Sequence, residues 1–457
     1  MTPLFSLPSQ QQRQQIIKLS LPILGGYLSL NLFWLIDIAM IGVLGTTSLA
    51  AVGFAGFLSW LTFSPFFGIV SALQTITARR LGENNLNDLI KPLHAGLIVI
   101  SLLALIFATI LIYFSQTIFN FLSSDPAVIS EGVTYFQIRM LSLICFGINV
   151  CFRGFWSGMK EPYQYYNFLY VIHGTNILLN WVLIYGNLGF TAMGSEGAAW
   201  ATSLSLCMGT CYYLISAYLK TKPLGFLKRK VTANDIKTLI TLGFPLGLEE
   251  FLYASSFSVF LAILDKLGTV EVAVANVIRH ISLFLFLPGR AFGIATASLV
   301  SESIGKKQYA EAKQWPLHAS KLVIIIPLLL GMGFIIFSKP LLALFLHDPH
   351  AHAMAQSLLT IDSAYLWSEA VYLVFLGGLI GVGASRHILL LCFLFQWCIF
   401  LPTAFIIGPF LGFPIIVIWW SMVVINVFKI LTIIIIWQRI NTKKYFLLTP
   451  FKSYSYD

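Results

Sequence analysis

The chain repeats its own pattern at a fixed offset of 223 residues, and this repeat limits the fold more than any other feature. Without a gap, Pro22 falls on Pro245 and Pro65 falls on Pro288. Because glycine and proline fix turns and kinks, the repeat predicts two halves built on one backbone design. The other matches at this offset join Leu44-Gly45-Thr46 with Leu267-Gly268-Thr269, Gly82 with Gly305, Asp125-Pro126 with Asp348-Pro349, Gly154 and Gly158 with Gly377 and Gly381, and Gly189-Phe190 with Gly412-Phe413.

Long apolar runs make up most of the sequence. Of the 457 residues, 58% are hydrophobic and 10% are charged, whereas soluble domains carry about 25% charged residues. We therefore predict an all-α integral membrane protein with twelve transmembrane helices in two pseudo-symmetric six-helix bundles of the same orientation, a parallel repeat. The twelve runs lie near 16–42, 48–76, 92–114, 130–157, 165–186, 194–218, 239–264, 272–300, 317–338, 353–381, 388–408 and 413–437.

A long charged connection separates the two halves. The predicted organisation is an N-terminal six-helix lobe over 1–218, a cytoplasmic linker over 219–238, and a C-terminal six-helix lobe over 239–457 that ends in a short cytoplasmic tail. The bases that mark the linker are Lys220, Lys222, Lys228, Arg229, Lys230 and Lys237.

The net charge of +10 reflects membrane topology rather than nucleic-acid binding. Of the 28 Lys and Arg residues, 22 lie at the two termini, in loops after even-numbered runs or at the run ends next to them, and only Lys266 and Lys339 lie in the alternate loops. This positive-inside pattern predicts a multi-pass protein with cytoplasmic N- and C-termini. Its partner is then the lipid bilayer, and no nucleic acid is expected. The four remaining bases fall inside runs: Arg139, Arg279, Arg290 and Lys429.

Polar side chains of the first half fall within one layer of the membrane. At about 1.5 Å per helical residue, Asp37 lies about 8 Å below the outer end of its run, and Asn180, Thr202 and Arg139 lie at roughly 9 to 13 Å. Asn176 precedes Asn180 by one helical turn, so the two share a face. Because ionisable groups in membranes are costly and usually functional, we predict a cation-coupling site formed by Asp37, Asn176, Asn180 and Thr202.

Asp37 is the centre of this predicted site. A desolvated carboxylate without a basic partner can load and release a proton, and with amide and hydroxyl oxygens beside it the site could also hold a sodium ion. Alternatively, Asp37 anchors the helix end just before Gly42. Arg139 is either a permanent partner of Asp37 or a charge of the substrate layer. Trp34 and Tyr27 are further substrate-layer candidates, although most membrane aromatics face lipid.

The second half places a deeper layer of charges in its runs. Glu249, Glu250, Arg290, Glu369 and Lys429 all fall roughly 20 to 27 Å from the outer side. One interpretation is a buried ion-pair network that ties the second bundle together. The other is a second-lobe site for the coupling ion or the substrate.

Proline recurs inside the apolar runs of both halves. Pro22 and Pro245 lie inside these runs, so they are either fixed kinks or hinges around a transport site.

The sequence contains no HExxH motif, nucleotide P-loop or GxSxG motif, and its cysteines lack zinc spacing. Asp348-Pro349, within the histidine-rich stretch 347–352, reads as a helix N-cap with proline at the first position. We therefore expect no enzyme, no metal site and no cofactor.

Several motifs resemble the multidrug and toxic compound extrusion (MATE) family over nearly the whole chain, and within it the DNA-damage-inducible protein F branch. The residues that carry the resemblance are Pro22 and Asp37-Ile38-Ala39-Met40-Ile41-Gly42-Val43-Leu44-Gly45 of the first run, Asn176-Ile177-Leu178-Leu179-Asn180 of the fifth, Gly197-Ala198-Ala199-Trp200-Ala201-Thr202 of the sixth, and Pro288, Ala295, Leu299-Val300, Gly305 and Glu311-Ala312 around the eighth.

The resemblance implies a V-shaped antiporter of two six-helix lobes in the bacterial inner membrane, and we expect it to be a monomer. Such a protein exports cationic, amphipathic or aromatic drugs and toxins in exchange for H⁺ or Na⁺. Asp37 matches the first-run coupling carboxylate of the family. Asn180 departs from it, since related members often carry Asp there, which concentrates coupling on Asp37. Glu369 matches a tenth-run acid of the sodium-coupled branch, and nothing is carried onto Glu249 or Glu250. The alternative function is a flippase for lipid-linked precursors on a related fold.

Overall fold

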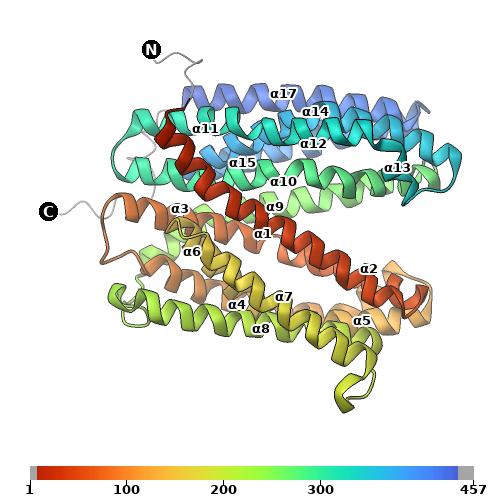
Figure 1. Cartoon of the computed structure of the whole chain (residues 1–457), viewed down its shortest axis with the longest axis horizontal. Helices are drawn as coiled ribbons and strands as arrows, with labels where there is room; N and C mark the ends of the chain where they lie inside the picture. Colours follow the sequence, from red (N-terminus) through yellow and green to blue (C-terminus); the bar gives the residue numbers. More distant parts are fainter. Residues whose placement is uncertain (1–7, 441–457) are drawn as a thin grey trace. The chain divides into compact units, whose positions relative to one another are not determined.

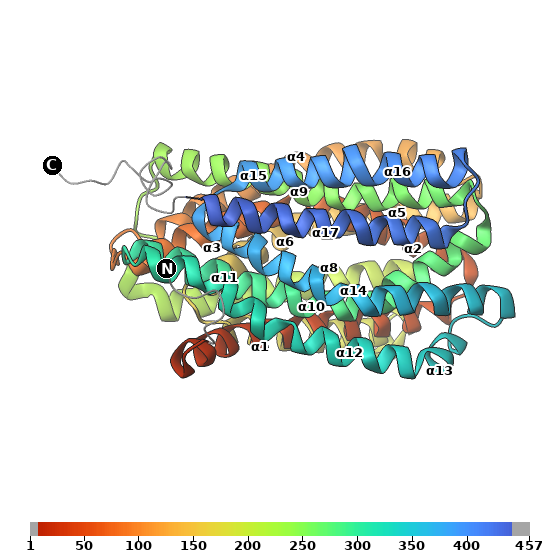
Figure 2. The same cartoon turned by 90° about the horizontal axis from the view of Figure 1, so that it is seen from above.

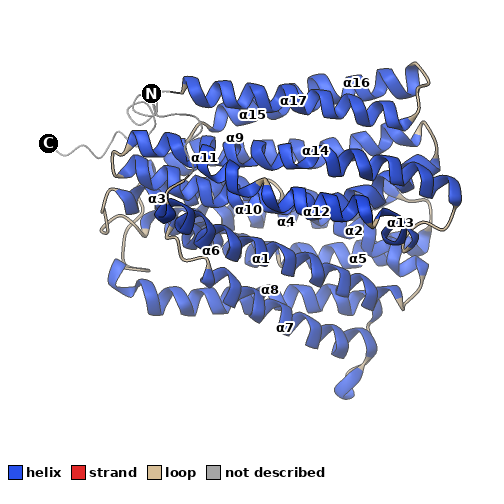
Figure 3. Ribbon diagram, turned by 45° about the horizontal axis from the view of Figure 1, so that its top comes forward, coloured by secondary structure: helices blue, strands red, loops and turns tan. Residues whose placement is uncertain are grey.

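A backbone inside lipid must satisfy its own hydrogen bonds, so long apolar runs fold as helices. The computed structural model describes residues 8–440, and within this range helices are joined by short turns without any strand (Figure 3). The helices of the first half are α1 (Gln10–Gly42), α2 (Thr46–Phe63), α3 (Phe66–Gly82), α4 (Lys91–Leu122), α5 (Pro126–Leu141), α6 (Leu143–Gly158), α7 (Tyr163–Tyr185), η1 (Asn187–Gly189), α8 (Gly194–Thr221) and η2 (Lys222–Leu224).

The second half follows the same order with fewer breaks early and more breaks late (Figure 1). Its helices are α9 (Ala233–Asp265), α10 (Thr269–Gly305), α11 (Tyr309–Val323), α12 (Ile325–Ile336), α13 (Ser338–Ala343), α14 (Pro349–Val382), α15 (Ser385–Cys392), η3 (Phe393–Phe400), α16 (Leu401–Phe405), η4 (Ile406–Phe410) and α17 (Ile415–Arg439).

The membrane-spanning character of the helices agrees with the predicted fold class. Among the described residues, ten helical segments are long and apolar enough to cross a membrane, and the bent pair of α5 and α6 would make eleven. The remaining predicted run, 194–218, forms α8, whose serine, threonine and glycine residues make it less apolar than the others. The all-α membrane class is thus confirmed, although α8 is not apolar enough to count as a candidate span by composition alone.

The internal repeat is visible in how helices pack within each half. A Cβ atom added at Gly154 of α6 would lie 2.7 Å from the carbonyl oxygen of Val70 on α3. The equivalent Gly377 of α14 meets the carbonyl oxygen of Gly293 on α10, and Gly293 lies 223 residues after Val70. Glycine is therefore required at both positions because two backbones approach closely there.

Turn geometry repeats as well. Gly45 and Gly268 precede α2 and α10, and both have positive φ angles, 110° and 156°. Asp125 and Asp348 cap α5 and α14, where their carboxylates accept backbone N–H bonds, with proline directly after each. The predicted N-cap at Asp348 is confirmed.

One break in the repeat concerns the helix that carries Arg139. In the first half, α5 ends at Leu141, α6 begins at Leu143, and the two are bent by 48°. The Ser142 hydroxyl donates to the Arg139 carbonyl oxygen at 2.8 Å. In the second half the equivalent position is Tyr365, inside the uninterrupted α14.

The chain forms two compact units. One is Gly25–Gly247, and the other joins the residues up to Leu24 with those from Leu248 onward. In the first unit α3 packs on α6 and α7 on α8. In the second α14 packs on α10, α12 and α17 (Figure 2). Each boundary falls two residues after a helical proline, Pro22 in α1 or Pro245 in α9. Hinge motion at these prolines stays a prediction, as does the division into lobes at a 219–238 linker.

Candidate functional site

The predicted cation-coupling residues of the first unit form one hydrogen-bonded chain. The Asn180 side-chain amide donates to the Asp37 carboxylate at 2.6 Å and to the Asn176 amide oxygen at 3.1 Å. The Asn176 amide donates to the Thr202 hydroxyl at 3.3 Å. Three helices, α1, α7 and α8, thus supply a single polar line inside an apolar bundle. Their spacing in sequence, with Asn176 and Asn180 one turn apart, is what aligns the two amides.

Burial and an unpaired oxygen distinguish this chain of hydrogen bonds. Asn176 and Asn180 are buried, while Asp37 is half-buried. The Asn180 side-chain oxygen is buried and has no hydrogen-bond partner within the described part of the chain. An amide oxygen in this position can accept a hydrogen bond from the carboxyl group once that group is protonated, or it can serve as a ligand for a hard cation.

Arg139 does not pair with Asp37 among the described residues. Its guanidinium lies 5.6 Å from the centre of the Phe63 ring, and its Nη1 atom is buried with no hydrogen-bond partner. The predicted depth of Arg139 gave no information about the direction of its side chain. Asp37 therefore keeps amide neighbours in place of a permanent ion pair.

The two aromatic candidates of the first unit have different surroundings. The Tyr27 hydroxyl accepts a hydrogen bond from Arg153 at 2.5 Å, and the Arg153 guanidinium also lies over the Tyr27 and Tyr165 rings at 5.0 and 4.9 Å. Trp34 is 48% exposed. Arg153 was not predicted as a site residue, because it lies little more than one turn before the end of α6, next to the cytoplasmic bases.

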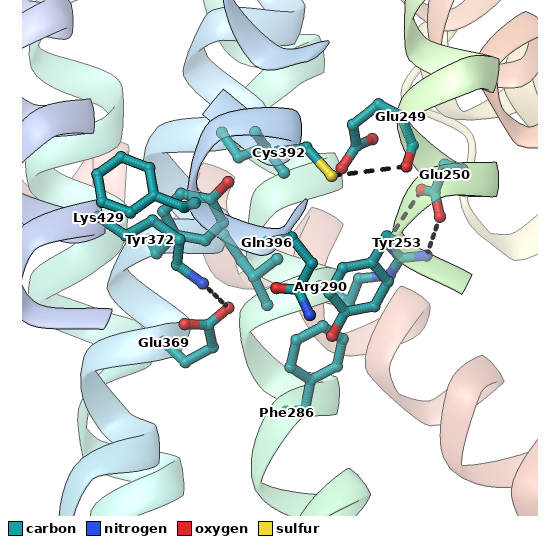
Figure 4. Close-up of a pocket in the computed structure, with 13 residues that line it drawn as sticks. Glu249, Glu250, Tyr253, Phe286, Arg290, Glu369, Tyr372, Cys392, Gln396 and Lys429 are labelled. Atoms are coloured by element: carbon teal, nitrogen blue, oxygen red, sulfur yellow. Dashed lines mark hydrogen bonds and ion pairs between the residues drawn. The ribbon is translucent and has the colours of Figure 1, made fainter. Parts of the chain in front are cut away.

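The charges of the second unit line one cavity (Figure 4). Glu250 accepts two bonds from Arg290, at 3.0 and 3.4 Å, and Glu369 accepts one from Lys429 at 3.0 Å. These contacts match the ion-pair interpretation of the predicted layer. The residues that surround the cavity are Glu249, Glu250, Tyr253, Phe286, Arg290, Glu369, Tyr372, Leu373, Leu376, Cys392, Phe395, Gln396 and Lys429.

Glu249 is the acid of the cavity that takes part in neither ion pair. No described residue forms an ion pair or hydrogen bond with its carboxylate, while its backbone carbonyl oxygen lies 3.8 Å from the Cys392 thiol. The cavity therefore holds three acids and two bases. Lys429 is also 4.2 Å from the centre of the Tyr372 ring, so its charge is shared between Glu369 and an aromatic face.

Helix irregularity shapes one wall of this cavity. Phe395 and Gln396 belong to η3, a stretch of wide π-helical turns that directly precedes Pro402. Proline cannot donate the bond that a regular helix needs, and such wide turns recur at functional sites. The sequence predicted a single run over 388–408, and the position of these wide turns did not follow from it.

The sequence matches the MatE family over residues 22–182 and 245–406, one stretch in each half. The chain therefore belongs to this family, and it is a membrane transporter rather than an enzyme. The family resemblance is confirmed, whereas the branch within the family stays a prediction.

Similar curated proteins are the probable multidrug resistance protein NorM of Pasteurella multocida, 25% identical over 405 residues and 86% of each chain, and the multidrug resistance protein NorM of Photobacterium profundum, 25% identical over 407 residues with 87% and 88% covered. Among solved structures, an outward-facing multidrug resistance MATE family transporter has a TM-score of 0.87 at 19% identity, with 95% and 96% covered. A MOP superfamily transporter from Pyrococcus furiosus has a TM-score of 0.86 at 19% identity, with 96% of each chain covered. The structural likeness supports the fold.

Proposed function

We propose that this transporter is a secondary active multidrug exporter that exchanges cationic, amphipathic or aromatic compounds for H⁺ or Na⁺. The observation that carries the proposal is the hydrogen-bonded line from Asp37 through Asn180 and Asn176 to Thr202. Two relatives are named as multidrug resistance proteins, which supports drug-sized organic substrates.

A proton on Asp37 would reverse the polarity of its bond to Asn180. In the present geometry a carboxylate oxygen accepts from the Asn180 amide nitrogen. A neutral carboxyl must instead donate, and the unpaired Asn180 oxygen can accept once the amide rotates. The rotation would also break the bond from Asn180 to Asn176. Protonation at α1 would thus be felt at α7 and, through Thr202, at α8.

Alternating access requires that the ion and the drug each bind one conformation better than the other. Asp37 shares α1 with Pro22, which lies fifteen residues earlier, beside the boundary between the two compact units. Loading of Asp37 would shift α1 between bent and straight forms at Pro22, with Pro245 as its counterpart in α9. The same oxygens could hold Na⁺ in place of the proton.

The cavity of the second unit favours cationic compounds over anionic lipid precursors. A flippase for lipid-linked precursors needs a basic cavity, whereas this one has three acids against two bases. Glu249 offers a carboxylate to a substrate cation, and Tyr253, Phe286 and Tyr372 offer aromatic faces.

The cellular setting of the proposal is the bacterial inner membrane, in which a monomer would span the bilayer many times. We place both termini on the cytoplasmic side because most Lys and Arg residues lie there in the predicted topology. The tail over 441–457 lies outside the described residues.

The test is efflux of a fluorescent organic cation from proteoliposomes under an imposed pH or sodium gradient. Asp37→Asn removes the titrating group and keeps the side-chain size, so gradient-driven efflux should fall to the level of protein-free vesicles. Asp125→Asn is the matched control, since asparagine also caps helices well, and its efflux should equal that of the wild type. Full gradient-driven efflux by Asp37→Asn would refute the coupling role of Asp37.

A further inference from the structure

A second buried carboxylate lies in the second unit, away from the ion pairs of the cavity. Asp362 of α14 is 4% exposed and is surrounded by an apolar cluster that includes Phe260, Ile278 and Leu358. One oxygen of its carboxyl group is 2.5 Å from the Ser282 hydroxyl of α10. The other accepts a bond from the Trp419 indole N–H of α17 at 2.9 Å.

No base neutralises this group. Asp362 forms no ion pair with any residue that the structure describes. Charged and titratable groups on the helices packed around it face other partners. Arg279 of α10 stacks on Phe257 at 3.5 Å, its neighbour His280 has interactions of its own, and Lys429 of α17 pairs with Glu369. Two neutral donors alone hold Asp362, and a dry, unpaired carboxyl group favours its neutral form.

The internal repeat shows that the scaffold does not require this acid. The position equivalent to Asp362 in the first half is Arg139, 223 residues earlier, and the position equivalent to Ser282 is Ser59. The same place in the shared backbone design thus holds a permanent base in one half and a titratable acid in the other. A purely structural demand common to both halves would not reverse the charge.

Polar side chains follow Asp362 along α14 toward the cavity. Asp362, Tyr365 and Glu369 follow one another at three- and four-residue spacing along α14, so they share one face of that helix. Asn426 of α17 lies beside Tyr365. Glu369 lines the cavity, and its Oε2 atom is buried without a hydrogen-bond partner. The Tyr365 hydroxyl can accept one proton and donate another, which is the property that a relay needs.

We propose that Asp362 is a proton-binding site of the second unit, held by Ser282 and Trp419 and connected to the cavity through Tyr365 and Glu369. In the neutral state the carboxyl O–H donates to the Ser282 hydroxyl. Release passes the proton to the Tyr365 hydroxyl while that hydroxyl gives its own proton to the unpartnered Oε2 of Glu369. Glu369 holds this proton only in transit to the cavity, so its ion pair with Lys429 is restored. Ser282 and Trp419 then both donate to the ionised Asp362, so no bond is left unmade.

The test follows the carbonyl stretch of protonated carboxyl groups by infrared difference spectroscopy on the purified full-length transporter in lipid nanodiscs. Between about pH 5 and about pH 9, where buried carboxyls titrate, the wild type should lose a band that Asp362→Asn lacks and Asp37→Asn retains. In Ser282→Ala the band should persist to higher pH, because the bond that the ionised form loses is charge-assisted and stronger than the bond that the neutral form loses. Trp419→Phe should act in the same direction.

The outcomes are separable from those for the proposed function. A band that is identical in wild type and Asp362→Asn overturns the inference, as does an Asp362 band that stays constant over the whole pH range. If Asp362→Asn fails to fold, the Ser282→Ala and Trp419→Phe shifts decide, and their absence overturns it. The dependence of gradient-driven efflux on Asp37 is measured in a separate experiment, so either proposal can fail without the other.

Discussion

The two units hold their buried acids in opposite ways. In the first, Asp37 is held by the Asn180 amide and forms no ion pair with a described residue. In the second, Glu250 and Glu369 are each held by a base. An acid held by an amide can lose its charge without stranding a buried cation, whereas an acid held by a base cannot. We therefore propose ion loading at Asp37 in the first unit and structural ion pairs beside a cation-receptive cavity in the second, where Asp362, like Asp37, is held by neutral donors.

The largest expected effect tests the ion pairs of the second unit. Lys429→Met leaves the Glu369 carboxylate buried without its base, and we expect a loss of about 3–5 kcal/mol in the free energy of unfolding. Thermal unfolding in detergent measures it. Adding Glu369→Gln should recover most of the loss, and Lys306→Met, which breaks the more exposed pair with Glu302, should cost at most about 1 kcal/mol. Equal losses for the two lysine variants would contradict a buried structural pair.

The next effect compares the glycine contacts of the two units. Gly377→Ala and Gly154→Ala each force a methyl group against a neighbouring backbone and should cost about 1–3 kcal/mol. Gly377→Ala should cost more, since its contact with Gly293 is closer. Gly53→Ala is the control: nothing surrounds that position, so the helical preference for alanine should raise stability by about 0.5–1 kcal/mol. The same thermal measurement ranks the three variants.

A smaller effect concerns the unpaired acid of the cavity. Glu249→Gln breaks no ion pair, so the free energy of unfolding should stay close to that of the wild type. The KM for a monovalent organic cation should rise by roughly tenfold, equivalent to about 1.4 kcal/mol. Transport of an uncharged aromatic compound by the same variant serves as control and should keep its KM. A parallel rise for both compounds would place the charge of Glu249 outside substrate binding.

The smallest effect adds an acid to the first unit. Asn180→Asp places a second carboxyl group at hydrogen-bond distance from Asp37, and two such groups resist joint ionisation. The shared proton is then kept to higher pH, so the pH at which efflux is half-maximal should rise by about one unit. A pH profile of proteoliposome efflux measures the shift. No shift, or a fall, would argue that protonation at Asp37 does not limit the cycle.

Much of the fold could be predicted because its determinants are one-dimensional. Apolar run length fixes the spans, and the Gly and Pro repeat fixes turns and close helix contacts such as Gly154 with Val70. The contact between Asn176 and Asn180 was also predictable, since the two residues share a helix face whatever the tertiary packing. These features depend on spacing along one helix.

What could not be predicted depends on the rotation of one helix about its axis relative to another. Depth alone could not decide whether Arg139 pairs with Asp37, and the structure shows its guanidinium over the Phe63 ring. Depth also failed to show that Glu249 would be the acid without a base. Asp362 was missed because its partners, a serine and a tryptophan, carry no charge that marks them in sequence.

The interruption at Ser142 has a consequence for exchange of backbone hydrogen with solvent. Because α6 starts anew at Leu143, the backbone amides of its first turn lack a regular acceptor within the helix. Around Tyr365 the helix α14 continues unbroken, so every amide there has its regular acceptor. Deuterium should therefore enter the first turn of α6 sooner than the matching turn of α14. The first unit would open locally next to Arg139, and the second would stay closed next to Asp362.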